Sequence, residues 1–176
     1  MSNIVEEDNI YFETIVSQNV LSIPVNKNNA KTPIQLGVRV TNLSSNPYRF
    51  SIFYLGIELK TVNGHNIQLE YARNATRYPE AADFPLIELG KNFAFLLNAD
   101  LYWIHNTLVI GGRDKSGGFW TFRNLNPGTY QVQFTYKSEK SRVKLHEGGT
   151  IVEGIWIGIA TTPFVELRLT HTIMTK

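Results

Sequence analysis

The feature that most constrains this chain is an alternation of apolar and polar residues with a period of two. It is clearest in residues 34–40, 130–136 and 165–169, where every second residue is apolar and the residues between are Gln, Glu, Thr, Arg or Gly. This period is typical of a β-strand with one face in a core and the other in water. A shift of one residue would move the whole apolar set into solvent, so the register of each strand is firmly determined. We predict an all-β fold.

Further strands are predicted where apolar and β-branched residues are bounded by turn-forming residues. They lie near residues 10–16, 20–25, 48–55, 57–62, 66–71, 92–97, 107–110 and 154–159, with turns at residues 44–47, Asn63-Gly64, Gly111-Gly112, Gly117-Gly118 and residues 126–128. No segment has the apolar spacing of an amphipathic helix over three turns, and residues 79–82 are expected to form at most one helical turn. With 176 residues, 43% of them hydrophobic, the chain suffices for one sizeable core, so we expect residues 1–176 to form a single domain.

The charge of the chain is almost balanced, with 17 Lys and Arg residues against 15 Asp and Glu residues and a formal net charge of +2. Phosphate recognition requires a clustered basic face, so we expect no nucleic-acid partner. The apolar stretches are too short to span a bilayer, and the first residues lack the pattern of a secretory signal, so we expect no membrane association. The absence of cysteine excludes disulfides and thiolate metal sites and fits a cytoplasmic location.

Three segments carry patterns of turn and core residues that belong together. In residues 125–136, a Pro-Gly turn leads into an alternating strand with an early tyrosine, Tyr130. Residues 156–167 contain Trp-x-Gly, a small hydroxylic residue and an alternating closing strand, and residues 38–44 contain a strand followed by a polar turn. These segments resemble bacterial immunoglobulin-like sandwich domains, and residues 38–44 are also similar to intracellular proteinase-inhibitor-type domains. The resemblance implies an immunoglobulin-like antiparallel β-sandwich, in which Tyr130 would bond back to the preceding corner. No inhibitory motif is matched.

Two segments are longer than a minimal immunoglobulin-type sandwich of about 100 residues requires. Residues 72–90 show little alternation, and residues 137–150 are polar and end in two glycines before Thr150. We therefore interpret them as two long loop insertions, and long ordered loops are often functional. Arg77 and Tyr78 on the first, with Arg142 and Lys144 on the second, are the predicted binding residues, because interfaces favour aromatic and cationic side chains.

No arrangement of residues indicates catalysis, a metal or a cofactor. None of the four histidines has metal-type spacing; they are His65, His105, His146 and His171. Residues 111–118 resemble a phosphate loop only superficially, because a strand-like segment follows where a helix is required. Glu80, Asp83 and Glu88 share one insertion, but nothing in the sequence places them on rigid strands as paired acids. We therefore predict no catalytic residue, no metal ligand and no cofactor, and a protein that is not an enzyme.

The aromatic residues leave two interpretations open. Five of them would either form a platform for a sugar or partner protein or belong to the sandwich core: Trp103, Trp120, Trp156, Tyr71 and Tyr78. Tyr78 is the one expected to be exposed. The first hypothesis is a non-catalytic module that binds another protein, with an inhibitor of intracellular proteinases as a special case. The alternatives are a carbohydrate-binding sandwich and an enzyme with an unrecognised site.

Overall fold

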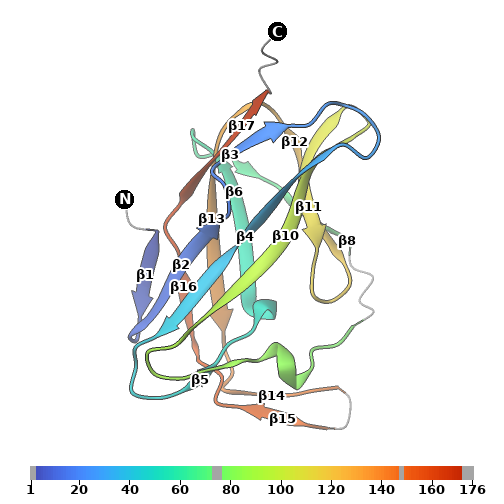
Figure 1. Ribbon diagram of the computed structural model, residues 1–176. Helices are drawn as coiled ribbons and strands as arrows, with labels where there is room; N and C mark the ends of the chain where they lie inside the picture. Colours follow the sequence, from blue (N-terminus) through green and yellow to red (C-terminus); the bar gives the residue numbers. More distant parts are fainter. Residues whose placement is uncertain (1–2, 73–76, 147–148, 172–176) are drawn as a thin grey trace.

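The computed structural model describes residues 3–72, 77–146 and 149–171, and β-strands dominate them (Figure 1). A seven-stranded sheet has the order β1 (Ile4–Glu7), β2 (Ile10–Val16), β4 (Lys31–Asn42), β10 (Asn92–Ile104), β11 (Thr107–Arg113), β12 (Phe119–Leu125) and β8 (Leu69–Ala72). A second sheet has the order β3 (Val20–Ile23), β17 (Val165–His171), β13 (Gly128–Ser138), β6 (Leu55–Thr61) and β7 (Asn66–Ile67), with β16 (Gly158–Thr161) also paired to β13. The all-β prediction is confirmed.

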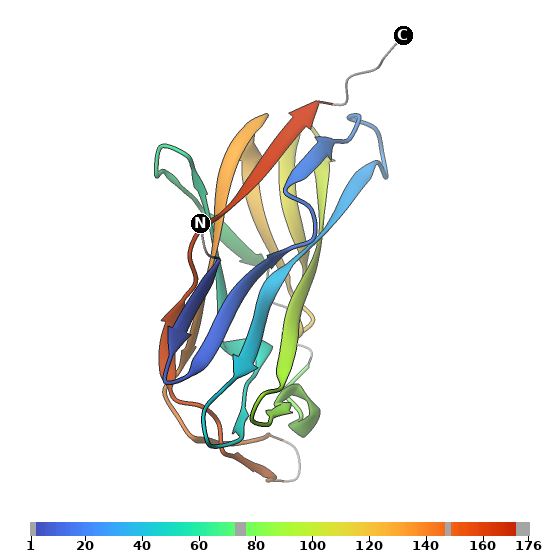
Figure 2. The same cartoon turned by 60° about the vertical axis from the view of Figure 1, so that its left-hand side comes forward.

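Short elements complete the described chain. The strand β5 (Tyr48–Arg49) pairs with β9 (Leu86–Ile87), β14 (Arg142–Lys144) pairs with β15 (Ile151–Glu153), and the two 3-10 helices are η1 (Ile52–Tyr54) and η2 (Ala81–Asp83). The pairing between named strands is antiparallel except at one place. Near the beginning of the chain, β2 pairs with β4 in the first sheet, and β3 then runs parallel to β17 in the second (Figure 2). This parallel pair departs from the antiparallel sandwich expected from the sequence.

The core lies between the two main sheets and contains the apolar side chains of the alternating strands. Val40 of the first sheet and Phe134 and Leu167 of the second are fully buried. Contact between the sheets is direct, since the ring centroid of Phe12 on β2 lies 5.6 Å from that of Tyr136 on β13. The alternation read from the sequence therefore reports which face of each strand is buried.

Tyr130, at the start of β13, makes the corner contact predicted for it. Its hydroxyl accepts a hydrogen bond from the Asn126 N–H at 2.8 Å and donates one to the Asn126 carbonyl at 3.0 Å. Both bonds reach backbone groups four residues upstream, in the turn between β12 and β13. The tyrosine therefore fixes the point where the chain crosses from the first sheet to the second, and this prediction is confirmed.

The Trp-x-Gly segment has a steric explanation. Trp156 is buried beside Phe12, Phe50 and Tyr136, with ring centroids 5.2, 6.0 and 5.9 Å away. A Cβ atom on Gly158 would lie 2.4 Å from two carbons of the Trp156 ring, so the tryptophan occupies space that any larger residue would need.

The small hydroxylic residue that follows this segment, Thr162, lies between β16 and β17. Its buried hydroxyl accepts hydrogen bonds from the Phe134 N–H at 3.0 Å and from the Thr14 hydroxyl at 2.6 Å. These bonds tie β13 of the second sheet to β2 of the first at the point where β13 changes its partner from β16 to β17.

Several strand boundaries differ from those predicted. Gly111 and Gly112 were expected to form a turn, but they lie inside β11. Glycine is needed there because the neighbouring strands approach closely: a Cβ on Gly112 would lie 2.1 Å from the Asn98 carbonyl oxygen. The chain reverses instead at Asp114–Gly118, whose backbone groups are hydrogen-bonded to each other.

Three other segments also differ. The strand predicted at residues 48–55 is limited to β5 and is followed by η1, which the Ser51 side chain caps. The strand at 154–159 begins only at Gly158, whereas the strand at 92–97 continues to Ile104. The segment at 137–150, predicted to be a loop, contains the strand β14, which pairs with β15 immediately after that segment.

Candidate functional site

The two predicted insertions pack against each other at one end of the molecule, where β5, β14, β15 and η2 lie (Figure 1). Phe84 from the first insertion forms a small buried cluster with Leu145, Val152 and Ile155. A cavity of about 350 Å³ is lined by residues 77–81 together with Leu145 and Thr150. We call this surface, formed by residues 77–90, 139–146 and 149–155, the insertion end; residues 73–76 and 147–148 of the predicted insertions lie outside the described residues.

Local sequence explains the shape of each half. In the first half, Glu80 and Asp83 form a reciprocal capping box around η2, and the Glu80 N–H donates to Asp83 Oδ2 at 2.8 Å. In the second half, Val143 and Val152 face each other across β14 and β15 and pack inward. Because side chains alternate along a strand, Arg142 and Lys144 project from the opposite, exposed face of β14.

Arg77, a predicted binding residue, is already engaged within the protein. Its guanidinium donates to both carboxylate oxygens of Asp83, at 3.0 and 2.8 Å, and to the Lys115 carbonyl at 3.0 Å. Both bonds to Asp83 come from one nitrogen, Nη2, and hydrogen bonds between two charged groups are stronger than neutral ones. Arg77 therefore fastens the first insertion to the turn between β11 and β12 and holds the adjacent Tyr78 in place.

Tyr78 lies where the sequence predicted it, on the surface, with 54% of the residue exposed. Its ring is stacked on that of His146, with centroids 4.3 Å apart and planes 9° apart. The two rings come from different insertions, so the structure joins the first pair of predicted residues to the segment that carries the second. Sequence analysis treated His146 only as an isolated histidine.

Exposed apolar side chains extend this end of the molecule. Leu86 and Leu89 of the first insertion and Leu43 of the turn after β4 are each about half exposed. Leu43 and Leu89 flank one backbone contact, in which the Gly90 N–H donates to the Asn42 carbonyl at 2.7 Å. Sequence reasoning missed these leucines because single apolar residues in loops carry no periodic signal.

The aromatic platform considered for the sequence is not assembled. Trp120 and Trp156 are buried, and Trp103 is half buried, with its indole N–H donating to the Pro24 carbonyl at 2.8 Å. The indole N–H groups of Trp120 and Trp156 have no hydrogen-bond partner among the described residues. The core interpretation of these tryptophans is the one the structure supports, whereas Tyr71 and Tyr78 are exposed.

The titratable groups with shifted pKa values serve the fold. Burial raises the pKa of Tyr136, whose hydroxyl oxygen accepts a hydrogen bond from the Ser51 N–H at 3.1 Å, and burial also raises the pKa of Tyr54. A hydrogen bond from the Lys137 ammonium lowers the pKa of the exposed Glu139 carboxyl. Within the described ranges, no group of three or more His, Asp or Glu side chains is placed to hold a metal ion.

Comparisons with protein-family models, with curated proteins and with solved structures found no match for this chain. In the described part of the chain, none of the helices has the length and apolarity needed to cross a membrane.

Proposed function

We propose that this chain is an immunoglobulin-like sandwich that binds another protein, without catalysis, through its insertion end. The observation that carries the proposal is the packing of two long insertions around their own buried cluster, which leaves the stacked rings of Tyr78 and His146 exposed. Of the buried apolar residues at the insertion end, only Ile87 belongs to the main core, whereas Phe84, Leu145, Val152 and Ile155 form the separate cluster. An inhibitor of intracellular proteinases would be one such module.

The order of the strands supports the immunoglobulin-like part of the proposal. The neighbours β17, β13 and β6 correspond to the G, F and C strands of such domains, and β2, β4 and β10 correspond to A, B and E. Tyr130 stands at the start of β13, the position of the tyrosine corner in strand F. In this interpretation, the hairpin of β11 and β12 is inserted between strand E and an edge strand D, represented by β8.

Preorganisation supports the insertion end as the contact surface. The Arg77–Asp83 pair and the capping box of η2 hold the first insertion, while the β14–β15 ladder holds the second. A surface that is ordered before binding loses less conformational entropy in the complex than a flexible loop does. Exposed tyrosine and leucine side chains grouped at one end are also the kind of apolar surface that partner proteins cover.

Charge at the insertion end favours a partner with an acidic patch. Arg142 and Lys144 lie on the exposed face of β14, opposite Glu153 and Ile151 of β15. Neither cation forms an ion pair with a described residue. Cations at an interface rim act mainly on the association rate and make that rate sensitive to salt.

The proposal is tested by capturing partners from the native host with the wild-type chain and with Tyr78→Ser, followed by affinity measurements on the purified partner. The control is Ile159→Ser, which changes an equally exposed side chain on β16, in the second sheet. Tyr78→Ser is expected to weaken binding at least about tenfold, the range of an aromatic hot spot, while Ile159→Ser leaves it unchanged. The proposal is wrong if both variants fold and bind the same partner as tightly as the wild type.

A further inference from the structure

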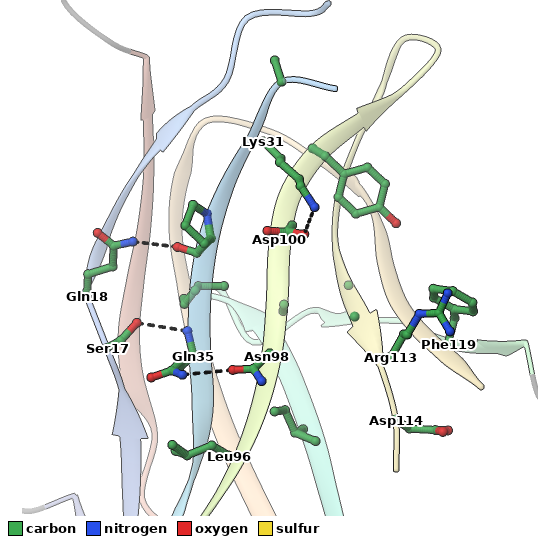
Figure 3. A pocket seen from close by; sticks show the side chains of 18 of the residues that line it. Ser17, Gln18, Lys31, Gln35, Leu96, Asn98, Asp100, Arg113, Asp114 and Phe119 are labelled. Atoms are coloured by element: carbon green, nitrogen blue, oxygen red, sulfur yellow. Dashed lines mark hydrogen bonds and ion pairs between the residues drawn. The ribbon is translucent and has the colours of Figure 1, made fainter. Parts of the chain in front are cut away.

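A second surface, separate from the insertion end, is a hollow on the outer face of the seven-stranded sheet (Figure 3). It crosses β4, β10 and β11 and has a volume of about 1380 Å³. Its middle is low because Pro33 and Gly111, which flank Asp100 of β10 in the sheet, contribute little or no side chain. Longer side chains surround this middle, including Lys31 and Arg113. The volume exceeds that of a typical small-molecule pocket, about 300–1,000 Å³, and so suits an extended ligand.

The floor of the hollow presents side-chain amides. Gln35 on β4 and Asn98 on β10 are directly opposite in the sheet, and the Gln35 amide nitrogen donates to the Asn98 amide oxygen at 3.0 Å (Figure 3). An amide group has two donor hydrogens and an acceptor oxygen, so each of these residues keeps hydrogen-bonding capacity after forming this bond. Groups with both donors and acceptors match the hydroxyls of a sugar.

The charge of the hollow is positive. Four cationic side chains and two carboxylates line it: Lys27, Lys31, Arg113, Lys115, Asp100 and Asp114. Lys31 neutralises Asp100 across 2.7 Å, and Asp114 Oδ1 accepts hydrogen bonds from the Ser116 and Gly118 N–H groups of its own turn. Lys27, Arg113 and Lys115 have no ion-pair partner among the described residues, so their charge is available to an anionic ligand.

We propose that this hollow binds an acidic oligosaccharide, a chain of sugars that carry carboxylate groups. The sugar hydroxyls would bond to the amides of Gln35 and Asn98, and the carboxylates would pair with Arg113 and Lys115 at the rim. The proposal does not depend on the function of the insertion end.

Two other anionic ligands fit the hollow less well. An acidic peptide that adds a strand would find an open backbone edge at residues 92–99 of β10, which pair with β4 alone, but only residues 96–99 of this edge line the hollow. Single-stranded nucleic acid requires open aromatic faces for base stacking. Of the three aromatic residues that line the hollow, Tyr102 and Trp103 are partly buried, and Phe119 has one ring face covered by Arg113, whose guanidinium carbon lies 4.8 Å from the ring centroid. Sugar hydroxyls need neither of these features.

The test is calorimetric titration of the full chain with hexagalacturonate, with maltohexaose as a neutral chain of equal length. Hexagalacturonate is expected to bind, maltohexaose to bind at least tenfold more weakly, and the affinity for hexagalacturonate to fall with added salt. The double variant Arg113→Gln/Lys115→Gln is expected to lose at least tenfold in affinity. The matched control Arg142→Gln/Lys144→Gln removes the same charge from the insertion end and is expected to stay within twofold of the wild type.

A second measurement locates the ligand and applies even if the double variant does not fold. In NMR titrations of the wild-type chain, hexagalacturonate is expected to shift the side-chain amide signals of Gln35 and Asn98. The proposal is overturned if hexagalacturonate does not bind, if both sugars bind equally, or if the two double variants lose affinity equally. It is also overturned if oligo-dT or polyglutamate binds more tightly than the acidic sugar, or if the shifts map to the insertion end.

Discussion

Replacement of Gly158 by alanine tests how tightly the core is fitted around Trp156. The new Cβ would lie 2.4 Å from two ring carbons, about 1 Å closer than an ordinary contact. The ring is only 2% exposed and lies between Phe12, Phe50 and Tyr136, so it has no free space to move into. Overpacking of this kind costs about 1–3 kcal/mol.

Gly56→Ala is a matched control. Gly56 also lies in a strand paired with β13, opposite Thr135, but a Cβ there would be 3.6 Å from the nearest atom, the Thr135 carbonyl oxygen, an ordinary contact. Alanine at an unstrained position restricts the unfolded chain and is expected to be neutral or to stabilise by up to ~1 kcal/mol.

Both variants are measured by urea denaturation and thermal unfolding. For a chain of this size, ~2 kcal/mol corresponds to a loss of about 4–8 °C in Tm. We therefore expect Gly158→Ala to unfold several degrees below the wild type and Gly56→Ala to unfold at or above it. Equal midpoints for the two variants would refute the claim that Trp156 requires glycine two residues later.

Three further predictions concern side chains of β13. Tyr130→Phe removes two hydrogen bonds to Asn126 and should lower the free energy of unfolding by ~1–2 kcal/mol in urea; an unchanged value would contradict the corner assignment. Phe134→Ala leaves a cavity at a fully buried position and should cost about 3–5 kcal/mol in the same assay, whereas a cost below ~1 kcal/mol would show that the site is loosely packed. Burial raises the pKa of Tyr136 above its usual value of about 10, so the folded state favours the neutral phenol. The resulting contribution to the free energy of unfolding is complete below pH ~10 and is lost as the pH rises further. Tyr136→Phe should therefore lose less stability than the wild type between pH ~9 and ~11.5, and parallel pH profiles would exclude this role.

The sequence predicted those parts of the fold whose cause is local. Alternation along a strand follows directly from one face being buried, which is why the inward direction of Val38 and Phe134 was predicted correctly. Gly111 and Gly112 were interpreted as a turn because the reason for glycine there is the approach of β10 and β12, which the sequence does not display. The strands β14 and β15 have three residues each, too few to show a clear alternation, and part of what stabilises them is Phe84, about 60 residues earlier in the chain.

The candidate surfaces were predictable only in part, for a similar reason. The exposure of Tyr78 followed from its irregular segment, but its stacking on His146 depends on the contact between two distant insertions. The hollow on the first sheet is formed where side chains are small, at positions such as Pro33 and Gly111 on strands β4 and β11. It becomes visible only when the strands are placed in register.

The parallel pair of β3 and β17 joins two strands that the ribosome makes far apart in time. Val20 pairs with Arg168, and Thr14 bonds to Thr162, which is 148 residues later in the chain. At a ribosomal rate of about 5–20 residues per second, the strand that contains Leu21 waits roughly 7–30 s for its neighbour to be made. Throughout that interval Leu21, fully buried in the finished fold, lacks its cover. The nascent chain therefore carries an open edge at β3 until β17 is made, and a chain cut before Val165 would keep that edge permanently.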